Sequence, residues 1–425
     1  MRPGHPRIYF VIQRELHMGS SDHTTHTGSP TVAVVGGGAV GVTAAADLAE
    51  RGAAVTLYER GSLGAGSSGR AAGVVYDAYA ADVDALIAAR AMERFRSFDR
   101  SLPGFSFTQC PYVIAVREGD PDANAIPAMV ERMRTHGRDV AVVDADALAD
   151  RFPIRTADIA AAALAEGAGW CDPARYVTAM AERARREGVH IETETAVAFD
   201  GTAAPTLRIG DCIRSFDAVV VAAGAHTEQL LETGTVRVPV TPYRVQALTS
   251  RVTYDGPMMY DATAGVYFRP HPTGLLAGDG TEPVAADPDE YDHEADDWFV
   301  EDTAETLRVR ADHELDLERA WAGLCTATPD GDPLVGPVGN DARGVFVAAG
   351  WQGHGFMRAP AFGEHIADGV LASLSNASDA ASTTAAGTST PRADPWITDF
   401  DPARFDGDEP VPIVEGMALD RRTER

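Results

Sequence analysis

The sequence contains no lysine. All 36 of its basic residues are arginines, and they face 63 acidic residues, which gives a formal net charge of −27 over 425 residues. A surface this acidic repels nucleic acids and anionic membranes, so we expect neither as a partner. It stays soluble where high ionic strength screens the self-repulsion, so a salt-adapted (halophilic) host is the simplest interpretation. An acidic docking face for a basic partner is the alternative.

Cysteines and long apolar runs are also scarce. The four cysteines are far apart and show none of the spacings of a metal site, so we expect no metal and a reducing, cytoplasmic location: Cys110, Cys171, Cys212 and Cys325. A run of about 18 apolar residues, which a membrane-spanning helix needs, is missing, so we expect no membrane insertion.

The two ends of the chain lack the pattern of a packed core. Residues 1–30 are polar and predict a disordered extension, with Met18 as an alternative start. Residues 373–394 consist mainly of Ser, Thr, Ala and Gly and predict a flexible linker. Apolar residues return around Trp396 and Phe400, so we expect residues 395–425 to dock on the body as a tail.

Between these ends, patterns typical of βα units alternate with patterns typical of strands. A chain this long exceeds a single core, so two domains are expected. We predict helices at about 173–187 and from about 356, and strands at 31–35, 54–58, 189–195, 217–223 and 345–349; strand-rich stretches lie at 108–116, 240–250 and 264–278. This order predicts a dinucleotide-binding domain from residues 31–105, 170–237 and 326–372. A substrate domain with a mixed or antiparallel sheet is predicted from residues 106–169 and 238–325.

The clearest motif is a glycine-rich turn between the first strand and the first helix. The apolar run 31–35 leads directly into Gly36-Gly37-Gly38-Ala39-Val40-Gly41, and an Ala-rich helix follows. In this fingerprint the glycines permit the tight turn and the close approach of a pyrophosphate to the helix N-terminus. The second strand ends at Glu59, where a carboxylate accepts the ribose hydroxyls of a dinucleotide.

A second loop rich in small residues, Arg60 to Gly73, follows Glu59 and can wrap the far side of a long cofactor. From this point the sequence resembles the flavoprotein family that contains D-amino acid oxidase, glycine oxidase and sarcosine oxidase. The resemblance continues at 217–225, at Val197, at 321–337, and at 345–357, which contains Gly353-His354-Gly355-Phe356-Met357. It implies an α/β (α+β) fold with a Rossmann-type FAD-binding domain of the glutathione reductase type.

The fingerprint and the resemblance together imply noncovalent FAD and assign a set of residues to it. The assigned residues are Gly36, Gly38, Ala39, Val40, Gly41, Glu59, Arg60, Ser67, Ser68, Arg70, Ala71, Ala72, Gly73, Val197, Ala223, Gly224, Gly350, Gly353, His354, Gly355, Phe356 and Met357. Glycines around His354 let backbone N–H groups approach a ligand, and a helix N-terminus favours the negative charge of a reduced flavin.

The resemblance also implies a reaction. Members of the family oxidise a C–N bond by hydride transfer to flavin N5, so a small amine or amino acid is the expected substrate: an N-methylglycine derivative, glycine or a D-amino acid. Tyr267 matches a substrate-binding tyrosine of glycine oxidase-like members, and Arg269 alternates with it along a strand. We therefore assign substrate orientation to Tyr267 and Arg269, and contact with the flavin or proton transfer to His354.

Three positions depart from the family. The arginine that clamps the substrate carboxylate falls on Cys325, and lysines of sarcosine oxidase-like members fall on Met357 and Leu276. The carboxylate clamp is therefore either rebuilt from another arginine or absent because the substrate differs; the available arginines are Arg70, Arg244, Arg269 and Arg358. Because the lysine at Leu276 promotes the reaction with oxygen, its loss favours a dehydrogenase that uses an electron carrier.

Two other functions fit the same pattern. A 2-hydroxy acid or glycerol phosphate dehydrogenase would oxidise C–OH rather than C–N on the same fold. A flavin-binding subunit for assembly or electron relay would bind FAD that no small substrate reduces. The substrate, the choice between oxygen and another electron acceptor, and the oligomeric state stay open at this point.

Overall fold

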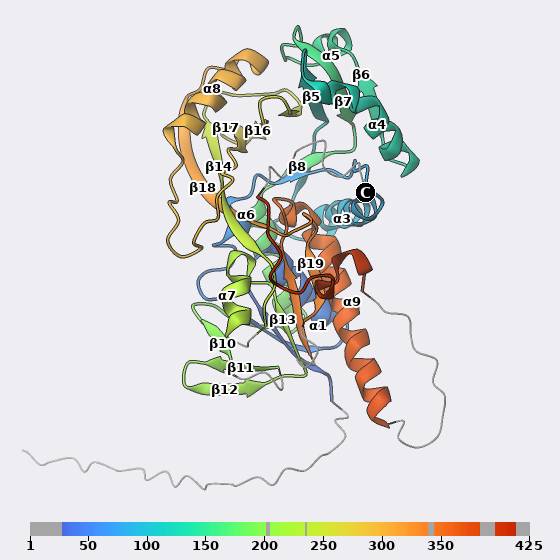
Figure 1. The fold of residues 1–425 in the computed structure, drawn as a ribbon, viewed down its shortest axis with the longest axis vertical. Coiled ribbons are helices and arrows are strands. Elements are labelled where there is room, and N and C mark those ends of the chain that lie inside the picture. Colours follow the sequence, from blue (N-terminus) through green and yellow to red (C-terminus); the bar gives the residue numbers. More distant parts are fainter. Residues whose placement is uncertain (1–27, 201–204, 234–235, 339–343, 383–395, 414–425) are drawn as a thin grey trace, which may run out of the picture.

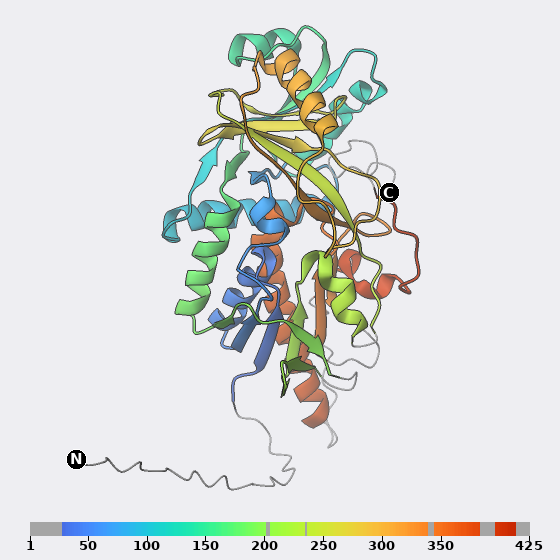
Figure 2. The same cartoon turned by 90° about the vertical axis from the view of Figure 1, so that its left-hand side faces the viewer.

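The computed structural model describes residues 28–200, 205–233, 236–338, 344–382 and 396–413. Within these ranges two large sheets lie toward opposite ends of the long axis, with helix α3 (Asp82–Ser101) and strand β8 (Gly169–Cys171) between them (Figure 1). Figure 2 shows the same arrangement from the side. The extension predicted for residues 1–30 falls, up to residue 27, outside the described residues.

The first sheet has six strands in the order β19-β20-β13-β1-β2-β9, and all but β19 run parallel. Their apolar, β-branched sequences suit strands that are buried on both faces. The bounds are β1 (Thr31–Val35), β2 (Ala54–Tyr58), β9 (His190–Glu192), β13 (Ala218–Val221), β19 (Leu334–Pro337) and β20 (Val345–Ala349). The predicted dinucleotide-type α/β fold is thereby confirmed.

Helices and a small sheet cover the two faces of this first sheet. Val32 and Val34 pack on the side of helices α1 (Ala39–Glu50), α6 (Pro173–Arg186) and α9 (Gly355–Ser382). Ala33 and Val35 share the opposite core with helix α7 (Thr227–Glu232) and a three-stranded antiparallel sheet. That sheet consists of β10 (Val197–Phe199), β11 (Thr206–Ile209) and β12 (Cys212–Ser215).

The second large sheet has eight strands in the order β18-β14-β17-β16-β15-β5-β7-β6. Only β5 and β15 pair in parallel, so the predicted mixed or antiparallel sheet is confirmed. The bounds are β5 (Tyr112–Arg117), β6 (Val140–Val143), β7 (Ile159–Ala165), β14 (Thr241–Ser250), β15 (Met258–Asp261), β16 (Val266–His271), β17 (Gly274–Asp279) and β18 (Leu317–Ala327). Helices α4 (Ile126–Thr135), α5 (Ala145–Arg151) and α8 (Asp297–Ala311) accompany it.

Smaller elements join the two parts. Helix α2 (Ser67–Arg70) lies in the second loop, and strands β3 (Val74–Val75), β8 and β4 (Phe107–Gln109) form a three-stranded sheet. In the tail, Trp396 stacks on Phe346, with ring centroids 5.5 Å apart, and Phe400 is fully buried against Phe362. The described part of the tail, residues 396–413, therefore packs on the first sheet and α9.

The prediction of a flexible linker from residue 373 is wrong for residues 373–382, because helix α9 continues to Ser382. Alanine has the highest intrinsic helix propensity, and the hydroxyls of Ser375 and Ser378 are satisfied within the helix by donating to the carbonyls of Leu371 and Leu374 one turn back. Residues 383–394 lie outside the described ranges. In the part that the structure describes, no helix is long and apolar enough to cross a membrane.

Candidate functional site

The glycine-rich turn has the geometry that its sequence predicts. A Cβ added to Gly36, whose φ is +115°, would lie 2.2 Å from the carbonyl oxygen of Ala222, and one added to Gly41 would lie 2.0 Å from the carbonyl oxygen of Gly36. Only glycine fits at either position. Gly38 is the N-cap of α1 and provides no side chain to cap it. The N-terminus of α1 therefore points its backbone N–H groups at the space beside the turn.

Glu59 closes this space from the end of β2. Its Oε2 accepts the backbone N–H of Gly37 at 2.7 Å, and its Oε1 accepts that of Gly61 at 2.8 Å. The neighbouring Arg60 turns away and pairs with Asp289 at 3.0 Å. The structure thus brings Glu59 to the turn, whereas the guanidinium of Arg60 is engaged elsewhere.

The second loop is held between α1 and β18. The Ser68 hydroxyl accepts the backbone N–H of Ala39 at 2.9 Å, and the Ser67 hydroxyl donates to the Leu324 carbonyl at 2.6 Å. The Arg70 guanidinium donates to the carbonyls of Ala65 and Gly66, back into its own loop. These bonds aim the end of the loop, Ala71 to Gly73, into a cavity.

Other residues assigned to the cofactor lie along the same edge of the first sheet. Ala223 and Gly224 follow β13, and the backbone at Ala222–Ala223 touches the turn at Gly36. Thr195, two residues before Val197, donates its N–H to the Glu59 carbonyl at 2.9 Å. The carboxyl ends of neighbouring parallel strands therefore meet here, as ligand sites of open α/β sheets do.

The turn before α9 forms the next part of the site. Gly350 and Gly353 have φ of +77° and +80°, and α9 begins at Gly355. Phe356 and Met357 line the cavity together with His354. A long helix that starts at a cavity wall gives this wall partial positive charge.

His354 is buried, and its Nδ1 has no hydrogen-bond partner among the residues that the structure describes. Burial, together with the positive charge of Arg358, lowers the pKa of His354 to about 3. The imidazole is therefore neutral over the whole physiological range of pH. A buried ring nitrogen without a partner at a cavity wall fits a site that a polar ligand completes.

The cavity has a volume of about 110 Å³ and two walls of different character. One wall comes from the second loop and the turn before α9: Ala71, Ala72, Gly73, Val74, Gln352, Gly353, His354, Phe356 and Met357. The other comes from the eight-stranded sheet and from the second residue after β17, Thr281: Tyr112, Tyr243, Val245, Tyr267, Asp279, Thr281 and Cys325. We call these the glycine-rich wall and the tyrosine wall.

Asp279 lies on the tyrosine wall because its backbone is irregular. It ends β17 opposite Gln246 of β14, so in a regular pleat it would face away from Tyr243 and Val245. Its φ is +123°, which is rare for a residue with a side chain and breaks the alternation at this point. Thr281 donates its hydroxyl to Asp279 Oδ1 at 2.7 Å.

All three tyrosines of this wall are close enough to Asp279 for its charge to affect their pKa. Burial raises the pKa of Tyr112, Tyr243 and Tyr267, and the negative charge of Asp279 raises each of them further. Tyr267 extends over Gly278, where an added Cβ would lie 2.4 Å from its hydroxyl oxygen. The predicted Tyr267 therefore lines the cavity, with two tyrosines and an acid that sequence reasoning missed. A Gly-Asp-Gly at a strand end was the one signal for Asp279.

Each of the four arginines considered for a carboxylate clamp is engaged elsewhere. Arg269 donates to the carbonyls of Ala72 and Pro270, and its guanidinium lies over the Trp170 ring. Arg70 bonds within its own loop, as described above. The remaining two form ion pairs: Arg358 with Asp84, and Arg244 with Glu282 and Asp296. None of the four is among the residues that line the cavity.

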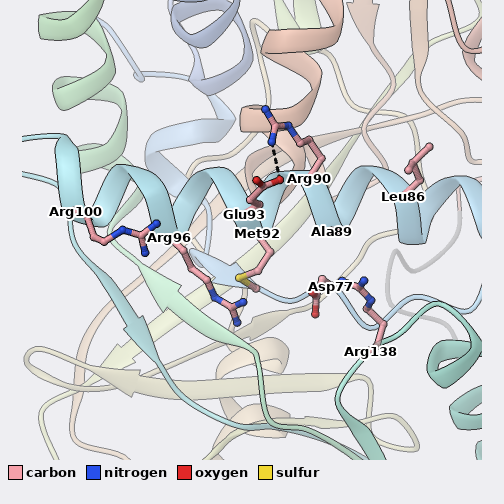
Figure 3. Close-up of a pocket in the computed structure, with 9 residues that line it drawn as sticks. All are labelled: Asp77, Leu86, Ala89, Arg90, Met92, Glu93, Arg96, Arg100 and Arg138. Atoms are coloured by element: carbon pink, nitrogen blue, oxygen red, sulfur yellow. Dashed lines mark hydrogen bonds and ion pairs between the residues drawn. The ribbon is translucent and has the colours of Figure 1, made fainter.

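A second, larger cavity of about 550 Å³ lies along α3 and shares no lining residue with the first (Figure 3). Two of the four arginines that line it form ion pairs: Arg90 with Glu364 and Glu93, and Arg138 with Asp77. The residues that sequence reasoning assigned to chemistry do not reach it. The candidate site is therefore the cavity between the glycine-rich and tyrosine walls.

Comparison with known proteins agrees with this geometry. Residues 31–369 match the family described as FAD dependent oxidoreductase. The 4-methylaminobutanoate oxidase (formaldehyde-forming) of Paenarthrobacter nicotinovorans is 26% identical over 85% of this chain and 46% of its own length. The glycine oxidase of Pseudomonas aeruginosa is 28% identical over 80% of this chain and 94% of its own length. This chain thus spans about half of the first relative and nearly all of the second.

Among solved structures, L-proline dehydrogenase from P. horikoshii is similar in fold. It superposes with a TM-score of 0.75 and 24% identity, and the match covers 90% of this chain and 99% of that one.

Proposed function

The chain belongs to the family of FAD-dependent oxidoreductases, and we propose that it oxidises a C–N bond of a small amine or amino acid. The observation that carries this proposal is the cavity with two walls, one of glycine-rich backbone and one of tyrosines, next to a dinucleotide turn. The names of the relatives support it, because 4-methylaminobutanoate oxidase and glycine oxidase both act on amines.

The residues present fit FAD. The close contacts at Gly36 and Gly41 suit the tight turn of a dinucleotide site, and the Nδ1 of His354, which has no partner among the described residues, is placed to accept a hydrogen bond from a ligand or donate one to it. The N-terminus of α1 would hold the pyrophosphate and Glu59 the ribose, while the glycine-rich wall would hold the flavin ring. FAD supplies the hydride acceptor: the C–H bond of the substrate breaks, its electron pair leaves with the hydrogen, and water hydrolyses the resulting C=N bond.

The protein's own residues then have three tasks. The tyrosine wall positions the substrate against the flavin, and Arg269 holds Ala72 and thereby the end of the second loop. His354 stays neutral, so it serves as a hydrogen-bonding partner rather than as an acid. Burial and the charge of Asp279 raise the pKa of the Cys325 thiol to about 12, and a thiol that is a poor nucleophile supports noncovalent FAD.

For the electron acceptor we favour a carrier over oxygen. Leu276, at the position where the family resemblance expects a lysine, is buried in an apolar cluster with Ala247 and Trp321, next to Tyr267. An aliphatic side chain therefore stands at the position where the resemblance expects a lysine, and the neighbouring Arg269 is bonded to the carbonyls of Ala72 and Pro270. This supports a dehydrogenase.

The test is an anaerobic scan of the visible flavin band of the purified holoenzyme at high salt. Sarcosine, dimethylglycine, glycine, proline, D-alanine and a 2-hydroxy acid are added in turn. We expect bleaching by an amine and slow recovery of the band when air is admitted. Bleaching by the 2-hydroxy acid alone would replace the proposal with C–OH oxidation. Bound FAD that no amine bleaches would favour a relay subunit.

A further inference from the structure

The lining of the cavity offers an acid but no cation. Among its lining residues Asp279 is the only carboxylic acid, no arginine lines the cavity, and the pKa of His354 lies near 3, so its imidazole is neutral. The carboxylate of an amino acid substrate is held most strongly by a cation, and the lining of this cavity instead presents a carboxylic acid. Bringing a second carboxylate beside Asp279 would place like charges together in a site with little water.

The same wall has the composition of an ammonium site. Three tyrosines, Tyr112, Tyr243 and Tyr267, line it with Asp279. Aromatic faces attract alkylated ammonium groups through their quadrupole, and a carboxylate adds direct Coulomb attraction. The hydroxyl of Thr281 fixes Asp279 Oδ1, and the positive φ of Asp279 stores backbone strain to keep the side chain on this wall.

From these observations we propose that the tyrosine wall binds the substrate through an N-alkylated ammonium group held by Asp279, and that substrates without a carboxylate next to the reacting C–N bond are preferred. The inference rests on the proposed function and narrows its substrate class. It also explains why Arg70, Arg244, Arg269 and Arg358 are not among the residues that line the cavity: a carboxylate clamp is not needed.

Two dead-end ligands test binding apart from turnover. Tetramethylammonium and acetate are titrated separately into the anaerobic holoenzyme at constant high ionic strength, and the shift of the flavin band gives each dissociation constant. We expect tetramethylammonium to bind at least about 10-fold more tightly than acetate. Asp279→Asn should raise the dissociation constant of tetramethylammonium by about 10- to 100-fold, the range of a charge-assisted contact. It should not raise the dissociation constant of acetate.

Glu290→Gln is the matched control. It removes one negative charge from an exposed residue outside the cavity, so both dissociation constants should stay unchanged. It separates the local effect of Asp279 from the general attraction of cations to an acidic protein. If Asp279→Asn does not retain FAD, the dissociation constants of the two ligands on the unsubstituted enzyme still show whether the cavity prefers a cation to a carboxylate.

Turnover is then compared between two matched substrates, sarcosine and sarcosinamide. In sarcosinamide an uncharged amide replaces the carboxylate, while the N-methyl amine is the same. We expect sarcosinamide to bleach the flavin with a kcat/KM at least about 10-fold higher. Tighter binding of acetate, faster bleaching by sarcosine, or an unchanged tetramethylammonium constant in Asp279→Asn would overturn the inference while leaving amine oxidation intact. Selective binding of tetramethylammonium without bleaching by any amine would support the ammonium site and refute the proposed function.

Discussion

Arg358 and Asp84 form an ion pair with 2.8 Å between Nη1 and Oδ1, and both side chains are almost completely buried. Arg358 lies one turn after His354 on α9, and its guanidinium is 4.8 Å from the centroid of the Tyr79 ring. The pair ties α9 to α3 directly behind the glycine-rich wall. An arginine that the sequence offered as a substrate clamp is thus part of the framework of the site.

Breaking this pair from one side should be costly. Arg358→Met leaves Asp84 buried without its counter-charge, so we expect a loss of about 3–5 kcal/mol in the free energy of unfolding. The double variant Arg358→Met/Asp84→Leu should recover much of that loss, because no charge then stays buried. Denaturant unfolding at constant high salt measures both. Arg100→Met, at an exposed position on α3, is the control and should change stability by less than about 0.5 kcal/mol. A loss below about 1 kcal/mol for the single variant would contradict the buried pair.

Glu59 should decide how firmly FAD is held. Glu59→Ala removes the carboxylate that accepts two backbone N–H groups and would accept the ribose, so we expect the FAD dissociation constant to rise by about 10- to 100-fold. The ratio of flavin to protein absorbance after gel filtration reports the retained cofactor. Glu187→Ala, an exposed acid just after α6, should leave that ratio unchanged. Full flavin content in Glu59→Ala would mean that the ribose is held elsewhere.

A methyl group at Gly41 should disrupt the dinucleotide turn. Gly41→Ala places a Cβ 2.0 Å from the Gly36 carbonyl oxygen, so β1 and α1 have to separate, and we expect loss of FAD binding and a lower melting temperature. Gly66→Ala is the matched control, since an added Cβ there meets nothing within 4 Å and its φ is −77°. Thermal unfolding and flavin content are measured for both. Equal melting temperatures and equal flavin contents of the two variants would refute the close packing at Gly41.

His354 should make the protein sensitive to acid. Its pKa is about 3 in the folded protein against 6.5 for an ordinary histidine, so between these values the unfolded state binds the extra proton. Stability therefore falls as the pH drops below 6.5, by about 2 kcal/mol at pH 5 for this one group. His354→Gln cannot titrate, so the loss of unfolding free energy between pH 7 and pH 5 should be smaller in this variant by about that amount. An identical loss in both proteins would show that His354 titrates normally.

Much of the cofactor side of the site could be read from the sequence. The turn at Gly36, the acid at Glu59 and the turn around His354 are local patterns of glycine and apolar residues, and strand β20 has the predicted bounds, Val345–Ala349. Local patterns of this kind depend on backbone geometry, which neighbouring residues largely determine.

The substrate side could not be read in the same way. Asp279 reaches the cavity only because its φ breaks the pleat, and alternation along β17 places it on the opposite face. The engagement of Arg358 depends on Asp84, which is far away in the sequence and has no motif. The helical continuation of α9 past residue 373 was missed because its small residues match the composition of linkers as well as that of helices. These features arise from tertiary contacts rather than local pattern.

The two segments that form the glycine-rich wall lie far apart in the sequence, and this determines when the wall can form during synthesis of the protein. The first half of the wall ends at Val74 and the second half begins at Gln352, so most of the chain is synthesised before they can meet. At the usual speed of a ribosome the interval is on the order of tens of seconds, during which the early βαβ unit waits without its partner strands β13 and β20. If the glycine-rich wall holds the flavin as proposed, capture of the flavin is therefore a late event. The yellow colour of bound flavin would mark chains that have completed folding. A nascent chain on a ribosome stalled before β20 would carry no flavin.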